Sequence, residues 1–119
     1  MDAIVLGGLR VMGTHGVLAE EQTRAQPFQV DVTLSVDLSA ASVSDALADT
    51  VDYGEVTGVV AGIVAGEHFA LLERLAGRIV EVVLGLDERI AAVDVTVTKL
   101  RPPVPSDLSS AAVRLVRSR

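Results

Sequence analysis

Residues 28–38 alternate apolar and polar side chains without interruption, and no other segment constrains the fold of this chain as strongly. Successive side chains of a β-strand point to opposite faces, so the run predicts a strand with one buried face and one polar face. The predicted buried positions are Phe28, Val30, Val32, Leu34, Val36 and Leu38. Other parts of the chain must cover these side chains, while the polar face is left to water or to a central cavity.

Three further segments are predicted strands. Residues 3–11 are apolar with glycines, and we expect them to pair with the alternating run as a hairpin. A turn at residues 13–16 and a polar loop over residues 20–26 form its long connection. Residues 91–99 alternate again, and residues 111–117 form a short fourth strand.

Two helices are predicted in the middle of the chain, after an irregular link over residues 39–50 that has room for a helical turn. The first covers residues 52–66, and its Asp52–Glu55 spacing is an acidic variant of the capping box. The second covers residues 71–84 and carries an apolar stripe at helical spacing. Gly85 follows it as the expected C-cap.

The elements follow the order ββααββ. This order predicts an α+β fold, in which an antiparallel four-stranded sheet carries two helices on one face. A length of 119 residues, half of them apolar, suits a single domain over residues 1–119. With no Trp, one Tyr and two Phe, the core must be aliphatic. Such a small domain has limited burial of its own, which favours a homo-oligomer.

Composition excludes several classes of function. A net charge of −6 argues against nucleic-acid binding, which needs a basic footprint. The absence of cysteine excludes disulfides, a thiolate nucleophile and a cysteine-based metal site. His15, read as a turn residue, and His68 lack partners at ligand spacing, so no metal site is expected. No signal peptide or bilayer-spanning run is evident, so we expect a soluble, cytoplasmic protein without membrane contact.

Lys99 is the only lysine of the chain, and it ends the strand predicted over residues 91–99. It shares a face with Val93, Val95 and Val97, at the end of an otherwise apolar row. A partly buried lysine can lose its proton and transfer it, which an arginine cannot do. The alternative is a strand-end lysine whose ammonium group reaches solvent.

Three more polar residues are candidates for a site. Glu73 stands beside Leu72 in the first turn of the second predicted helix. Its carboxylate either complements the helix dipole or anchors a flat heterocycle held between apolar side chains. Tyr53, the only tyrosine, either packs at a helix start or stacks on a ring and passes a proton. Glu21 is either a solvated loop charge, like its neighbour Glu20, or part of the site.

Four short motifs stand in a specific order and spacing along the chain. They are Gly13-Thr14-His15-Gly16 with Glu21 five residues later, Asp49-Thr50-Val51-Asp52-Tyr53-Gly54-Glu55-Val56, Leu71-Leu72-Glu73, and Thr98-Lys99-Leu100-Arg101-Pro102-Pro103-Val104-Pro105. Together they resemble the dihydroneopterin aldolase family over essentially the whole chain. The resemblance implies a tunnelling fold, in which four subunits join their sheets edge to edge into a barrel and two such rings stack into an octamer.

The resemblance also implies the reaction, a retro-aldol cleavage in folate biosynthesis. 7,8-Dihydroneopterin gives 6-hydroxymethyl-7,8-dihydropterin and glycolaldehyde. The C=N bond of the substrate accepts the electrons, so neither a lysine Schiff base, nor a metal ion, nor another cofactor is required. Re-addition of glycolaldehyde to the opposite face would give an epimerase side activity from the same residues.

By the same resemblance, the pterin binds between neighbouring subunits. Glu73 resembles the carboxylate that holds the pterin amino group and ring N–H. Leu72 resembles the residue that packs on the pterin face, and backbone groups of Val51 and Leu72 add contacts. Tyr53 resembles a tyrosine that the adjacent subunit stacks on the ring.

The catalytic residues implied by the resemblance are Lys99, Glu21 and Tyr53. Lys99 acts as general acid and base with a bound water, Glu21 holds the lysine and the side-chain hydroxyls, and Tyr53 assists proton transfer. Two alternatives remain open. A dihydroneopterin triphosphate epimerase would need several basic groups near the site, whereas only Arg101 lies close to Lys99 in the sequence. A non-catalytic ring module could bind a pterin or purine through the Glu73 pocket alone.

Overall fold

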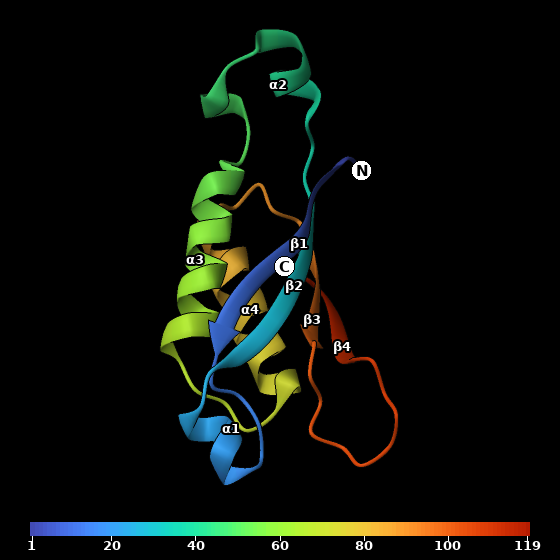
Figure 1. Ribbon diagram of the computed structural model, residues 1–119. Helices are drawn as coiled ribbons and strands as arrows, with labels where there is room; N and C mark the ends of the chain where they lie inside the picture. Colours follow the sequence, from blue (N-terminus) through green and yellow to red (C-terminus); the bar gives the residue numbers. More distant parts are fainter.

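A single antiparallel sheet in the order β1-β2-β3-β4 organises the computed structural model, which describes residues 1–119. Its elements are β1 Ala3–Gly13, α1 Ala19–Thr23, β2 Gln26–Ser35, α2 Ser39–Ser44, η1 Leu47–Asp49, α3 Tyr53–Gly66, α4 Leu72–Leu86, β3 Ala92–Lys99 and β4 Ala111–Ser118. The long helices α3 and α4 lie side by side on one face of the sheet (Figure 1). The α+β fold with a four-stranded antiparallel sheet is confirmed.

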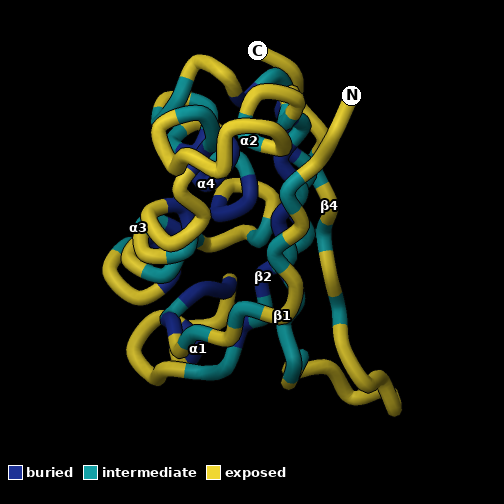
Figure 2. The backbone as a smooth tube through the Cα atoms, turned by 90° about the horizontal axis from the view of Figure 1, so that it is seen from above, coloured by how far each residue is buried: buried dark blue, intermediate teal, exposed yellow.

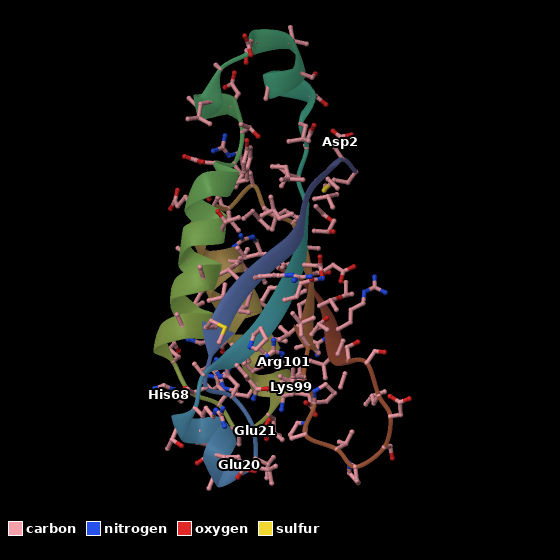
Figure 3. The ribbon with its side chains drawn as sticks, in the orientation of Figure 1. Asp2, Glu20, Glu21, His68, Lys99 and Arg101 are labelled. Atoms are coloured by element: carbon pink, nitrogen blue, oxygen red, sulfur yellow. The ribbon has the colours of Figure 1, made fainter.

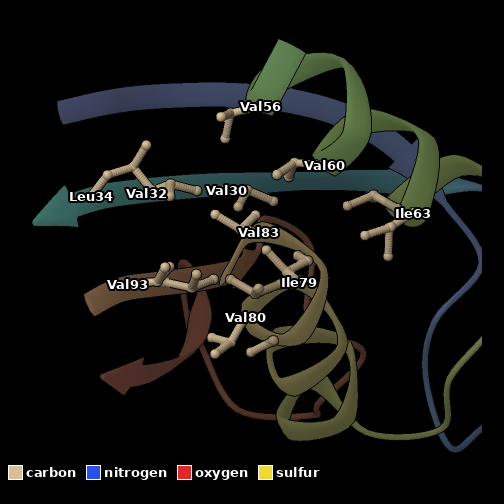
Figure 4. Close-up of a cluster of buried hydrophobic side chains, with 14 of the residues drawn as sticks. Val30, Val32, Leu34, Val56, Val60, Ile63, Ile79, Val80, Val83 and Val93 are labelled. Atoms are coloured by element: carbon tan, nitrogen blue, oxygen red, sulfur yellow. The ribbon is translucent and has the colours of Figure 1, made fainter. Parts of the chain in front are cut away.

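The core lies between the sheet and the two long helices, and its side chains are almost entirely aliphatic (Figure 4). In the alternating run, the five positions from Phe28 to Val36 are buried as predicted, whereas Leu38 is only partly buried. The strand itself is shifted, because β2 begins at Gln26 and ends at Ser35. Helix α3 begins at its predicted cap, where the Asp52 carboxylate accepts the Gly54 N–H at 2.9 Å.

Two local predictions are wrong. The polar loop expected over residues 20–26 contains the short helix α1 instead. Its first turn is stabilised by the Glu21 carboxylate, which accepts the N–H of Leu18 at 3.4 Å. Gly85 is not a C-cap, because α4 continues to Leu86. The guanidinium group of Arg119 donates to carbonyl groups at this helix end, and the Asp87 carbonyl accepts at 2.8 Å.

The molecule is elongated, with extents of 52 × 26 × 22 Å. Helix α1 lies at one end and α2 at the other (Figure 1). The connection between β3 and β4, residues 100–110, is exposed over most of its length and runs along the outside of the molecule (Figure 2). None of the helices combines the length and the apolar character needed to cross a lipid bilayer.

Strand β1 contains a bulge at its glycines. Its register against β2 shifts between Leu6 and Leu9. Gly8 has a φ of 75°, a conformation that side chains with a Cβ rarely adopt, and its N–H donates to the Asp31 carboxylate at 2.7 Å. The bulge lets β1 continue along the whole length of β2.

We expect Gly8→Ala to lower the free energy of unfolding by about 1–2 kcal/mol, because the left-handed backbone penalises a Cβ. Gly7→Ala is the matched control, since its Cβ would meet only the Asp31 carboxylate, at 3.9 Å. The control should change that free energy by less than about 0.5 kcal/mol. Denaturant titration of both variants measures the difference, and equal losses would contradict the assignment.

Candidate functional site

An ion pair between Lys99 and Glu21 lies where the end of β3 meets α1. The Lys99 Nζ donates to Glu21 Oε2 at 2.6 Å, and the two side chains are only 11% and 7% exposed. Figure 3 shows them approaching each other from their two elements. Glu20 beside them is exposed. The structure therefore shows that Glu21, and not the neighbouring Glu20, forms the ion pair with the only lysine of the chain.

The Glu21 carboxylate has further donors. Gln26 Nε2 donates to Oε2 at 3.0 Å, and the backbone N–H of Leu18 approaches Oε1 at 3.4 Å. Burial by itself raises the pKa of Glu21, but the hydrogen bonds from Lys99, Gln26 and Leu18 outweigh it and the pKa is lowered. The ordinary pKa of this carboxyl group is 4.5, and above that pH its full contribution to folding stability is present. The contribution is lost as the pH falls through the lowered pKa of the folded state.

Two glycines make room for this arrangement. A Cβ on Gly16 would lie 2.7 Å from the Cβ of Glu21 and closer still to its carboxyl group. A Cβ on Gly13 would lie 2.6 Å from the Val64 carbonyl oxygen and 3.0 Å from the His15 ring. The spacing of the Gly13-Thr14-His15-Gly16 motif thus follows from close packing around one imidazole and one carboxylate.

Lys99 and Glu21 open onto a pocket of about 350 Å³. The start of α4 forms another part of its wall, with Leu72 and Glu73, and the β3–β4 connection closes a side with Pro102 and Pro103. Glu73 is exposed and makes no hydrogen bond or ion pair within the chain. Backbone N–H groups in the first turn of a helix also lack intrahelical partners. The pocket therefore combines an amine, a free carboxylate, free N–H groups and an apolar wall.

Tyr53 and Val51 do not join this pocket within one chain. They line a second, mostly apolar pocket of about 470 Å³ at the start of α3. Helix α3 has 14 residues, about 21 Å of length at 1.5 Å per residue, and it separates this pocket from the Glu21 end. Tyr53 is 63% exposed, and its hydroxyl group has no hydrogen-bond partner in the chain. The backbone N–H and C=O groups of Val51 are also without a partner.

No group of three or more His, Cys, Asp or Glu side chains is placed to hold a metal ion.

The family model for dihydroneopterin aldolase matches residues 4–116 of the chain. The chain belongs to the dihydroneopterin aldolase family. It is a dihydroneopterin-cleaving aldolase, a carbon–carbon lyase of folate biosynthesis.

Individual members of the family agree with this assignment. The dihydroneopterin aldolase of Streptococcus pyogenes serotype M18 is 48% identical over 119 residues, which are 100% of both chains. The structure of the E. coli enzyme in complex with neopterin has a TM-score of 0.90 and 30% identity, and covers 99% of this chain and 100% of that chain. The Burkholderia thailendensis enzyme bound to guanine has a TM-score of 0.81 and 27% identity, and covers 99% of this chain and 91% of that chain.

Two residues that support the aldolase site from outside the pocket could not be identified from the sequence. His15, expected in the turn at residues 13–16, is fully buried, and its Nε2 donates to the Val64 carbonyl at 2.7 Å. Gln26 ends the predicted polar loop, yet its amide donates to both the Glu21 carboxylate and the His15 carbonyl. The flanking glycines were the available signal for His15, because they indicate close packing. Nothing in the sequence singles out Gln26.

We expect Gly16→Ala to lower kcat for dihydroneopterin cleavage by about 100-fold, because the new methyl group displaces the Glu21 carboxylate from Lys99. Gly58→Ala is the control, since its Cβ would meet no atom within 4 Å. Steady-state assays of glycolaldehyde release compare the two variants with the wild type. A wild-type kcat for Gly16→Ala would contradict the packing argument.

Proposed function

We propose that this aldolase works by metal-free general acid/base chemistry, with Lys99 moving the protons and Glu73 holding the pterin. The observation that carries the proposal is the shared pocket, onto which the Lys99–Glu21 pair and the unpaired Glu73 carboxylate both open. A retro-aldol site needs a proton-transfer group and an anchor for the ring.

The unpaired Glu73 carboxylate suits a ligand edge that presents two parallel donors. A pterin presents an amino group beside a ring N–H, and guanine presents the same pair. The related structures that hold neopterin and guanine support this recognition. Leu72 provides an apolar wall for the flat ring, and the free N–H groups at the start of α4 reach acceptors on its edge.

The chemistry breaks the bond between the two hydroxyl-bearing carbons nearest the ring. The hydroxyl group on the carbon of the leaving fragment loses its proton, and the C–O bond of that carbon becomes the carbonyl of glycolaldehyde. The electrons of the broken C–C bond pass into the ring C=N group. A proton then reaches the carbon that stays attached to the ring. Lys99 with a bound water performs both transfers without forming an imine. Glu21 holds one of the three lysine donors and so directs the others into the pocket.

The site is completed by a neighbouring subunit in a homo-oligomeric ring, a tetramer or a stacked octamer. The pocket of one chain contains no aromatic residue, while Tyr53 stands exposed at the far end of α3. Strands β1 and β4 each have one unpaired edge, which a second copy can extend. A neighbour joined in this way supplies Tyr53 to stack on the pterin and Val51 to donate backbone contacts.

A triphosphate substrate fits this pocket less well, because Lys99 is the only basic residue among its lining residues. Several cations close together are needed to neutralise a triphosphate. Epimerisation of dihydroneopterin itself needs only the same proton transfers, so we assign it as a side activity of the same site.

We expect Lys99→Met to lower kcat by about 1,000-fold, the range expected for loss of a general acid/base. Its Kd for neopterin should change by less than about threefold, because the ring anchor is intact. Glu73→Gln should instead weaken neopterin binding by about 10- to 100-fold through loss of a charge-assisted hydrogen bond. Fluorescence titration and product analysis measure both effects. Glu20→Gln serves as the carboxylate control and should match the wild type.

Mixed rings test the shared site. Tyr53→Ala and Lys99→Met subunits are each expected to be inactive alone. Co-refolded in equal amounts, they should recover roughly a quarter of wild-type activity, since random mixing gives that share of sites with both native residues. A mixture that stays as inactive as its components would mean that Tyr53 and Lys99 act within one chain, and would contradict a site shared between subunits.

A further inference from the structure

His15 joins the two halves of the active-site pocket. The ring is completely buried, stacks on Phe69 at 5.9 Å and meets the Phe28 ring edge-on at 5.2 Å between centroids. Its Nε2 donates to the Val64 carbonyl at 2.7 Å, and its Nδ1 accepts the Phe69 N–H at 3.1 Å. One nitrogen must therefore carry a proton and the other must not, so this environment selects a neutral imidazole.

The backbone next to this ring reinforces the same connection. The Gly16 N–H donates to the Phe69 carbonyl at 3.0 Å, so residues 15 and 16 bind both polar groups of Phe69. On the other side, Gln26 Nε2 approaches the His15 carbonyl at 3.4 Å and the Glu21 carboxylate at 3.0 Å. A continuous chain of contacts thus runs from Phe69, just before the Leu72–Glu73 wall, to the Glu21 carboxylate on Lys99.

We propose that His15 is a positioning residue of the aldolase, which as neutral imidazole locks the Glu21 segment to the segment that leads into the pterin-binding wall. The role rests on the proposed function of Glu21 and Lys99. His15 does not line the pocket that contains Lys99 and Glu73. It acts by keeping the Glu21 carboxylate, and through it the Lys99 amine, at a fixed distance from the Glu73 anchor.

Protonation of the His15 ring should weaken this connection between the two segments. An imidazolium would point a second N–H at the N–H of Phe69 and break that hydrogen bond. The charged groups that face the ring are His68 and Glu67 from the α3–α4 connection and Lys99 from β3. Burial lowers the pKa of His15, and its electrostatic interactions with His68 and Lys99 lower it further, against opposing effects from the Val64 hydrogen bond and Glu67. Folding stability therefore falls as the pH drops below 6.5, where the unfolded chain binds the proton first.

The test compares His15→Asn and His15→Phe with the wild type. Asparagine retains an acceptor for the Phe69 N–H, whereas phenylalanine retains only the stacking. We expect kcat at about pH 7.5 to fall about 100-fold for His15→Phe and less for His15→Asn, with Kd for neopterin changed less than kcat. His68→Asn is the control and should retain the wild-type kcat. A purely structural role would lower the melting temperature but leave kcat per folded subunit unchanged, and that result would overturn the proposal.

The pH profile gives a second criterion. The ratio of wild-type to His15→Phe kcat should shrink as the pH falls, because protonation removes from the wild type the acceptor for the Phe69 N–H, which phenylalanine already lacks. NMR of labelled histidine in the wild-type protein measures the titration midpoint of His15. This measurement does not depend on the folding of any variant. The ratio should shrink around that midpoint. A ratio that stays constant through it, or a ring already charged at about pH 7.5, would contradict the proposed role. Loss of activity in Lys99→Met, tested separately, distinguishes failure of this inference from failure of the proposed chemistry.

Discussion

The buried ion pair between Glu21 and Lys99 is the interaction on which the site depends. Removing two charges from water is costly, and such pairs often contribute little net stability. This pair persists because Gln26 and the Leu18 backbone also bind the carboxylate. Loss of one partner would leave an unpaired buried charge and would lower the folding stability by about 3–5 kcal/mol. We infer that the main role of the pair is to hold the Lys99 amine in position. Residue 16 is a glycine for the same reason, because a side chain there would displace the Glu21 carboxylate.

Much of the fold could be predicted because it depends on periodicity. The alternation from Phe28 onward fixed the buried face of β2, and helical spacing fixed α3 and α4. The errors lie where tertiary contacts decide local structure. Helix α1 forms in a polar segment because Glu21 folds back onto the Leu18 N–H. Helix α4 passes through Gly85, and its final carbonyls are bound by Arg119, which no local pattern could indicate.

The site was predictable in a different way. Lys99 stood out by its uniqueness and its place in an apolar row, and the structure places Glu21, Leu72 and Glu73 around the same pocket. Their roles came from the family resemblance and not from spacing. The burial of His15 could not be predicted, because a histidine between glycines suits a turn and only the tertiary fold brings Val64 and Phe69 against its ring. Tyr53 lines a second pocket of its own chain, as expected if the proposed site takes its tyrosine from a neighbouring subunit.

The most direct test of the central claim is the structure of the assembled protein with neopterin bound. The account predicts one pocket in which the pterin amino edge lies on the Glu73 carboxylate. In that pocket a side-chain hydroxyl should lie within hydrogen-bonding distance of Lys99 Nζ or of a water bound to it, with Tyr53 of a neighbouring subunit against the ring. A ligand that binds away from Lys99, or an assembly in which Lys99 and Glu73 open onto separate cavities, would contradict it.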